Sequence, residues 1–232
     1  MTGRVSLKIS ELFDSVQGEG PSAGAPATFL RLALCNLRCG FCDTRYTWDW
    51  QRFSYDDEVK LASVETLARR LQAVHGNRLI ITGGEPLVQG KALASLVELL
   101  PPELLIEVET NGTLPPPQAL LERVSQWNVS VKLTNSGEPE RDRVKPRALA
   151  ALLGSGRAWL KLVVGSSADC AEAERLIEQS GFARDRVLFM PLAATRAELA
   201  ERAPLIASEA LKRGIRPSPR LHVELWDGRR GV

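Results

Sequence analysis

The stretch TFLRLALCNLRCGFC, residues 28–42, joins an apolar run to three closely spaced cysteines. The run at 28–34 is rich in aromatic and aliphatic residues, and we predict a strand there. Cys35, Cys39 and Cys42 follow at once with the spacing C-x3-C-x2-C. A loop this short can wrap three thiolates around one metal centre, and soft thiolates suit zinc, copper(I) or iron–sulfur clusters. The stretch therefore predicts a metal-binding loop at the end of a strand.

Strand-like and helix-like runs alternate along the rest of the chain. We predict further strands at 77–82, 104–110, 129–133, 158–164 and 186–190. We predict helices at 64–74, 91–100, 117–126, 168–179 and 195–213. This alternation predicts parallel βαβ units and an α/β fold. About six such units are too few for a closed eight-stranded barrel, so the periodicity leaves a partial barrel and an open sheet as alternatives. No domain boundary is visible, and we expect one domain over 1–232.

A few segments depart from this alternation. Pro204, inside the last predicted helix, predicts a kink or a break there. Two polar segments, 43–60 and 134–145, fit no regular element, and we interpret them either as loops over a site or as ordinary surface loops. Residues 220–226 alternate between apolar and polar side chains, which predicts an edge strand.

Composition and charge narrow the class of protein. The chain has 232 residues, of which 44% are hydrophobic, and this is enough for a sizeable core. Lys and Arg number 30 against 28 Asp and Glu, and a net charge of +2 argues against a nucleic-acid partner. The first residues lack the apolar run of a signal peptide, and no apolar stretch approaches the ~20 residues of a membrane helix. We therefore expect a cytoplasmic location, no membrane partner and reduced cysteines.

The fourth cysteine and the histidines bear on the choice of metal. Cys170 lies far from the other three cysteines in sequence, and we interpret it as an ordinary helix residue. A structural zinc site needs four protein ligands, so a zinc-binding module would need His75 or His222 to complete it. A cubane iron–sulfur cluster needs only three protein thiolates, because one iron can take another ligand. We favour the cluster and keep the zinc module as an alternative.

The cysteine spacing, placed just after the first strand of a βα chain, resembles that of the radical SAM superfamily. Enzymes of that superfamily hold a [4Fe-4S] cluster through three cysteines, and the fourth iron binds S-adenosylmethionine. Phe41 matches the aromatic residue that usually precedes the last cysteine. The run Gly83-Gly84-Glu85-Pro86 resembles the superfamily's Gly-Gly-Glu motif, which holds the methionine amino group. Glycines let a ligand approach the backbone, and a carboxylate accepts hydrogen bonds from an ammonium group.

The flanking sequence resembles one family within this superfamily, the 7-carboxy-7-deazaguanine synthases of queuosine-type nucleoside biosynthesis. The matching segments are 11–44, 82–86, 109–112, 130–132 and 218–222. The resemblance implies a homodimer with an incomplete barrel, and a reducing partner such as flavodoxin. It implies that 6-carboxy-5,6,7,8-tetrahydropterin is converted to 7-carboxy-7-deazaguanine with loss of ammonia. S-Adenosylmethionine is used catalytically in this family, a hydrogen is taken from C6 of the pterin, and magnesium assists the ring contraction.

The resemblance also implies a set of residues for each ligand. For the cluster it implies Cys35, Cys39 and Cys42, and for magnesium it implies Thr44. For S-adenosylmethionine it implies Phe41, Gly83, Gly84, Glu85, Ser130 and Lys132, to which we add Met190 and Pro191 at another strand end. For the pterin it implies Val16, Gln17, Gly18, Glu19, Arg31, Thr82, His222 and Val232.

The chemistry of these side chains agrees with that assignment. A carboxylated pterin needs a cation for its carboxylate, and Arg31 offers a planar two-donor fork. Gln17, the Gly18 backbone and Glu19 can pair with the amide and amino edge of a pterin. Without the resemblance we would interpret Arg31 as a strand-end salt bridge and Glu19 as a loop carboxylate. The alternative function is a glycyl-radical activating enzyme, which shares the cofactors and similar cysteine spacing but acts on a protein.

Overall fold

The computed structural model describes residues 5–232, apart from the side chains of Ala73 and His75. One nine-stranded sheet runs through this part of the chain in the order β3-β1-β2-β4-β5-β6-β7-β8-β9. β1 pairs antiparallel with β2 and β3, and every other neighbouring pair is parallel. The strands are β1 (Ser6–Val16), β2 (Pro26–Leu32), β3 (Lys60–Ser63), β4 (Arg78–Gly83), β5 (Leu105–Thr110), β6 (Gln126–Val129), β7 (Ala158–Val164), β8 (Val187–Pro191) and β9 (Arg216–Pro217).

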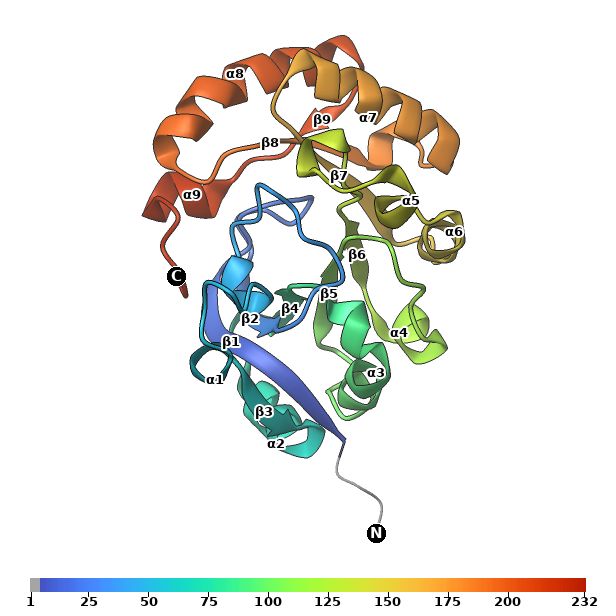
Figure 1. Cartoon of the computed structure of the whole chain (residues 1–232). Helices are drawn as coiled ribbons and strands as arrows, with labels where there is room; N and C mark the ends of the chain where they lie inside the picture. The colour runs from blue at the N-terminus through green and yellow to red at the C-terminus, as the bar shows by residue number, and fades with distance from the viewer. Residues whose placement is uncertain (1–4) are drawn as a thin grey trace.

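The helices lie along the outer side of the curved sheet (Figure 1). They are α1 (Tyr55–Glu58), α2 (Val64–Arg70), α3 (Gly90–Glu98), α4 (Gln118–Arg123), α5 (Glu140–Arg143), α6 (Pro146–Gly154), α7 (Ser167–Ser180), α8 (Arg196–Lys212) and α9 (Leu221–Trp226). β3 and β9 stand at the two ends of the sheet and, within residues 5–232, do not pair with each other. The prediction of an incomplete barrel is therefore confirmed, with β2, β4, β5, β6, β7 and β8 as its βα strands.

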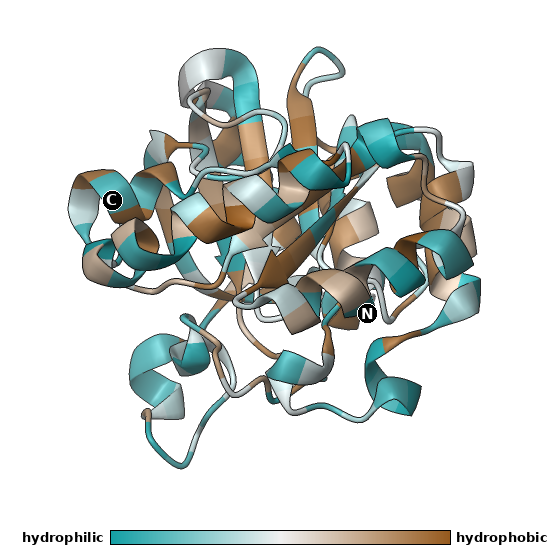
Figure 2. Ribbon diagram, turned by 90° about the horizontal axis from the view of Figure 1, so that it is seen from above, coloured by the Kyte–Doolittle hydropathy of each residue, from teal (hydrophilic) through white to brown (hydrophobic). Residues whose placement is uncertain are grey.

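The two faces of the sheet differ in chemistry. In β5, Ile106 and Val108 belong to the large hydrophobic core between sheet and helices, whereas Glu107 and Glu109 point to the opposite, inner face. Figure 2 shows the same division, with apolar strands at the centre and polar outer faces on the helices. The inner face is where polar side chains from distant strands meet, so the fold places a polar chamber inside an apolar shell.

β1 contains an irregularity that decides which way its side chains point. Its register with β2 shifts between Ile9 and Glu11, and an extra residue in a strand turns the following side chains to the other face. Ile9 accordingly lies in the hydrophobic core, while Glu11 bonds to Arg31 beside the inner chamber. A regular strand would place both residues on one face.

Three predicted elements differ from the structure. The strand predicted at 129–133 is β6 at Gln126–Val129, and the helix predicted at 117–126 ends at Arg123. Val131 and Leu133 are buried outside any strand, and their alternation imitates one. The predicted edge strand at 220–226 is wrong, because Leu221–Trp226 form α9. Only one residue of this helix, Val223, is buried, so its alternating pattern carried little information about packing.

The remaining differences are local. α8 runs through Pro204 without a break. Pro204 is exposed, so the carbonyl group that loses its helical partner can be hydrated. The segment at 43–60 contains a 3-10 turn and α1, and the segment at 134–145 contains α5. No helix in the described residues is long and apolar enough to cross a membrane.

Candidate active site

A cavity of about 540 Å³ opens at the carboxyl ends of the parallel strands. This is the end of a βα barrel at which active sites form, because the loops that follow the strands converge there. Its wall includes strand-end residues such as Arg31 of β2, Thr82 of β4, Glu109 of β5, Lys161 of β7 and Met190 of β8. The cavity therefore gathers side chains from strands that span most of the chain.

Most of the residues predicted from the sequence line this one cavity. They are Val16, Gln17, Gly18, Glu19, Arg31, Cys35, Cys39, Phe41, Cys42, Thr44, Thr82, Gly83, Gly84, Ser130, Lys132, Met190, His222 and Val232. The cavity wall does not include Glu85 and Pro191, which are both buried. Sequence reasoning therefore grouped residues that the fold does bring together.

The three cysteines lie on one part of the cavity wall as free thiols. Cys39 is buried, and Cys35 and Cys42 are half-buried. Burial raises the pKa of the Cys35 thiol to about 12. A bound metal offsets such a rise, because metal binding displaces the thiol proton.

Gly83 and Gly84 leave the backbone beside the cysteine loop without side chains. A Cβ on Gly84 would lie 2.1 Å from the carbonyl oxygen of Leu34 and 3.0 Å from Cβ of Cys35. Gly83 has φ +135°, and a Cβ there would lie 2.0 Å from the carbonyl oxygen of Leu32. Only glycine allows the end of β4 to lie against the start of the cysteine loop. Three cysteine sulfurs that can act as soft metal ligands thus lie on the cavity wall beside a backbone without side chains. This arrangement fits an iron–sulfur cluster.

The zinc alternative finds no support in the described residues. His222 lies against Gly18 and Glu19 rather than beside the cysteines. The side chain of His75, the other predicted zinc ligand, lies outside the described residues.

Glu85 is fully buried behind the glycines and is bonded on all sides by the protein. Its carboxylate accepts hydrogen bonds from the backbone N–H of Leu87 at 2.9 Å, the Thr110 hydroxyl at 2.8 Å and the backbone N–H of Asn111 at 2.7 Å. Burial nevertheless raises its pKa. These bonds tie the turn after β4 to the end of β5, so Glu85 fixes the backbone that carries Gly84. Its role toward a methionine amino group stays a prediction.

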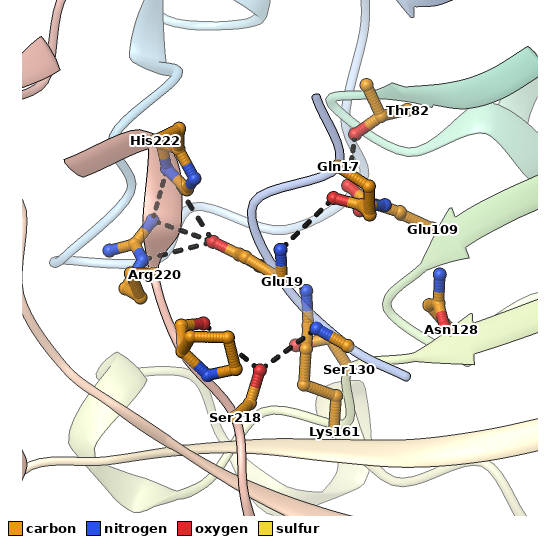
Figure 3. Close-up of polar contacts among 12 residues, drawn as sticks. Gln17, Glu19, Thr82, Glu109, Asn128, Ser130, Lys161, Ser218, Arg220 and His222 are labelled. Atoms are coloured by element: carbon orange, nitrogen blue, oxygen red, sulfur yellow. Dashed lines mark hydrogen bonds and ion pairs between the residues drawn. The ribbon is translucent and has the colours of Figure 1, made fainter. Parts of the chain in front are cut away.

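Glu19 is the centre of a buried ionic cluster on the cavity wall (Figure 3). Its carboxylate bonds to Lys161 and to Arg220, whose Nη2 lies 3.0 Å from Oε1, and the His222 Nε2 atom lies 3.8 Å away. Burial opposes ionisation of Glu19, but the two cations outweigh it and hold its pKa well below the usual range. Arg220 also pairs with Asp43 at 2.7 Å. One carboxylate thus joins a loop after β1 to β7 and to the segment before α9.

Backbone contacts reinforce this junction between the two ends of the chain. Leu221 N–H donates to the Gly18 carbonyl at 2.8 Å, and Gly20 N–H donates to the Ser218 hydroxyl at 2.9 Å. A Cβ on Gly18 would lie 2.1 Å from Nδ1 of His222. Gly18 is therefore required for His222 to lie directly against the loop at 17–20.

Glu109 links two of the predicted pterin residues, although sequence reasoning gave it no role. It accepts hydrogen bonds from Gln17 Nε2 at 3.1 Å and from the Thr82 hydroxyl at 2.7 Å. Lys161 and Arg220 were also missed. A usable signal existed for Glu109 and Lys161, because each interrupts an apolar strand with a charge, and a buried charge needs a partner.

For Arg31 the sequence left two interpretations open, a strand-end salt bridge and a ligand for the pterin carboxylate, and the structure is compatible with both. Its Nε donates to Glu11 at 2.7 Å, so the strand-end salt bridge exists. Glu11 also accepts from the Tyr46 hydroxyl at 2.9 Å and pairs with Arg230 at 3.2 Å. The guanidinium still lines the cavity, and its two Nη atoms make no hydrogen bond to the described residues. The bond to Glu11 therefore holds the free edge of the fork toward the cavity.

Thr44, predicted for magnesium, lies beside the last cysteine, and the Ser130–Lys132 pair predicted for S-adenosylmethionine lines the same cavity. The Thr44 hydroxyl is 3.6 Å from the Cys42 sulfur. Lys132 donates to the Ser130 hydroxyl at 3.0 Å, and the Ser130 N–H donates to the Thr110 carbonyl at 2.7 Å, which anchors this pair to the end of β5. Val232 reaches the cavity from the C-terminal segment.

Comparison with known proteins adds three findings. A model of the radical SAM superfamily matches residues 32–145. The chain is 37% identical to a 7-carboxy-7-deazaguanine synthase of Pyrobaculum aerophilum over 100% of both chains, and 38% identical to one of Hyperthermus butylicus over 94% of this chain and 92% of the relative. A crystal structure of QueE from Escherichia coli superposes with a TM-score of 0.70 at 26% identity, covering 95% of this chain and 96% of that chain.

Proposed function

The chain belongs to the 7-carboxy-7-deazaguanine synthase family of radical SAM enzymes, and from this membership we propose its reaction. It converts 6-carboxy-5,6,7,8-tetrahydropterin to 7-carboxy-7-deazaguanine with release of ammonia, in the biosynthesis of queuosine-type deazapurines. The full-length identity to a named synthase carries this proposal. The glycyl-radical activating alternative is not favoured, because the named relatives that match along the chain are synthases.

A [4Fe-4S] cluster and S-adenosylmethionine are the cofactors of this superfamily, and when bound they supply the 5′-deoxyadenosyl radical that takes a hydrogen from the substrate. Cys35, Cys39 and Cys42 would hold the cluster. The residues that would bind S-adenosylmethionine are Phe41, Gly83, Gly84, Ser130, Lys132 and Met190, with Glu85 and Pro191 behind them. The chain's own contribution is to orient the reactants and keep water away from them.

Other residues that line the same cavity suit the pterin. Arg31 offers its free edge to the substrate carboxylate, while Gln17, Glu19 and Thr82 present donors and acceptors to the ring edge. Burial lowers the pKa of His222 although Glu19 opposes the shift, so its ring is neutral at neutral pH and presents one donor and one acceptor. Val16, Gly18 and Val232 complete this set.

Further parts of the proposal rest on the family alone. Thr44 would contribute one oxygen to magnesium, with substrate oxygens and water filling the remaining positions that this hard ion prefers. The chain would work in the cytoplasm as one radical SAM domain in a homodimer, and a flavodoxin-like protein would supply the electron. Reduced thiols, which the cluster requires, favour that compartment.

Anaerobic reconstitution with iron and sulfide, followed by turnover of 6-carboxytetrahydropterin with S-adenosylmethionine and reductant, tests the proposed function. Formation of 7-carboxy-7-deazaguanine supports it. A brown protein that only cleaves S-adenosylmethionine would disprove the substrate, and a colourless protein would disprove the enzyme class. Omitting magnesium in a parallel reaction tests the metal, and an unchanged rate would remove Thr44 from the metal site.

Replacement of Arg31 by alanine is expected to weaken pterin binding about 10- to 100-fold, because it removes a charge-assisted hydrogen-bond pair worth about 1.5–3 kcal/mol. Binding of S-adenosylmethionine to the same variant is expected to stay unchanged, since the cysteine wall is untouched. Equilibrium titrations of the cluster-loaded variant with each ligand measure both effects. Arg52→Ala is the control, because the Arg52 side chain is 66% exposed and forms a long ion pair with Asp49 at 3.7 Å. An unchanged pterin affinity in Arg31→Ala would show that the proposed substrate orientation is wrong.

A further inference from the structure

The Cys42 sulfur lies beside two polar side chains. The indole Nε1–H of Trp48 donates to the Cys42 sulfur at 3.3 Å, and the Thr44 hydroxyl lies 3.6 Å from the same sulfur. Among the described residues, the Cys35 sulfur accepts only from the backbone N–H of Leu37 at 3.5 Å. Trp48 is 8% exposed, so its N–H has been removed from water and directed at the sulfur.

A positively charged side chain, Arg38, lies over the ring of Trp48. The Arg38 guanidinium lies over the indole ring at 4.9 Å from its centroid, and its Nη1 donates to the Trp48 carbonyl at 3.0 Å. Arg38 itself stands between Cys35 and Cys39 in the cysteine loop. A cation on the face of an aromatic ring is attracted to the ring electrons, and by drawing on them it makes the N–H edge more positive. The charge of Arg38 therefore strengthens the bond that Trp48 makes to Cys42.

We propose that Trp48, with Arg38 stacked on it, is a positioning residue that sets the reduction potential of the cluster through the sulfur of Cys42. The inference rests on the proposed function, which assigns the cluster to these cysteines. Reduction adds one negative charge that spreads over the cluster sulfurs. A donor that points at a ligand sulfur stabilises this extra charge, so it favours the reduced state.

The hydrogen bond from Trp48 to Cys42 would bear on the electron transfer that cleaves S-adenosylmethionine. The cluster must pass an electron to bound S-adenosylmethionine, so its potential has to be low enough to donate and high enough to be reduced by a protein partner. A single N–H bond adjusts that balance without adding a formal charge beside the sulfur. Arg38 adds its effect from the exposed side of the indole, where its own charge stays hydrated.

Trp48→Phe isolates the bond, because phenylalanine keeps an aromatic ring in the same buried position and lacks the N–H. In an anaerobic redox titration followed by electron paramagnetic resonance, we expect about a fivefold lower ratio of reduced to oxidised cluster at a fixed solution potential, as for the loss of one hydrogen bond of ordinary net strength. Arg38→Gln is expected to shift the ratio in the same direction by a smaller factor, because Trp48 keeps its N–H there.

Trp50→Phe is the matched control. Trp50 lies in the same loop and packs edge-on against Tyr55 at 5.0 Å, away from the sulfurs, so this variant is expected to titrate like the wild type. Iron and sulfide content is measured for every variant. A Trp48→Phe protein that loads the cluster and shows an unchanged ratio overturns the inference, and so does one that cannot load it while Arg38→Gln titrates like the wild type. Failure of the wild type itself to load a cluster would instead overturn the proposed function.

Discussion

Cys39→Ala is expected to yield a folded, colourless protein that neither binds a [4Fe-4S] cluster nor forms product. Two thiolates cannot hold a cubane that needs three protein ligands, and alanine offers no atom to replace the third. The folded state itself should persist, because Cys39 lies on a loop and alanine only removes one sulfur atom. Iron and sulfide analysis and the visible absorption of the reconstituted protein measure the loss, and circular dichroism verifies the fold.

The matched control for this experiment is Cys170→Ala. Cys170 is fully buried in α7, where it packs in the hydrophobic core far from the cysteine loop. Removing its sulfur is expected to cost about 1 kcal/mol of stability, as small core deletions do, and to leave cluster content and turnover unchanged. Product formation by Cys39→Ala, or loss of the cluster in Cys170→Ala, would contradict the assignment of the three ligands.

Glu19→Gln is expected to destabilise the protein by about 3–5 kcal/mol, because it leaves buried Lys161 without its partner carboxylate and buried Arg220 with Asp43 alone. Lys161 and Arg220 both depend on this carboxylate, and each side chain is only 6% exposed. The free energy of unfolding from urea titrations measures the effect. Pterin binding should fall in the same variant, since the loop at 17–20 loses its attachment to Arg220.

An exposed ion pair supplies the comparison. Asp142→Asn breaks the pair between Asp142 and Arg141, which lie 3.8 Å apart with side chains 48% and 86% exposed. Exposed pairs contribute about 0–1 kcal/mol, so this variant should unfold almost like the wild type. Equal losses in the two variants would mean that the Glu19 cluster is no stronger than a surface pair.

The same cluster predicts how stability depends on pH. The pKa of Glu19 is lower in the folded protein than its ordinary value of 4.5, because Lys161 and Arg220 favour the charged form, so the folded state binds fewer protons at this site. Its stabilisation is complete above that value and is lost progressively as the pH falls toward the folded pKa. The difference between wild type and Glu19→Gln should therefore shrink as the pH falls below about 4.5. A difference that stays constant to low pH would contradict the lowered pKa.

The parts of the site that could be predicted are those whose residues lie close together in the sequence. The cysteine loop and the glycine pair each act through neighbouring residues, so their spacing carries the information. The partners of Glu19 could not be predicted in this way. Lys161 and Arg220 lie 142 and 201 positions away, and only the curvature of the sheet brings them to one carboxylate.

Two elements show why local patterns misled the prediction of the fold. β1 was missed because the register shift between Ile9 and Glu11 interrupts its alternation. α9 was taken for a strand because its residues alternate, although contacts with Gly18 and Glu19 fix the start of this segment. In both cases a tertiary contact decides the local structure, and a single sequence does not record that contact.

The junction between the loop at 17–20 and the segment at 218–222 also has a consequence for biosynthesis of the protein. During synthesis the N-terminal part of the chain emerges from the ribosome first, at about 5–20 residues per second. The cysteine loop and Gly84 emerge in the first part of translation, and the bonds among them are short-range. The loop at 17–20 can form its contacts only after Ser218 and Arg220 have been synthesised, about 200 residues after Gly20 and Glu19. A nascent chain therefore exposes its three cysteines well before the residues around Glu19 can come together.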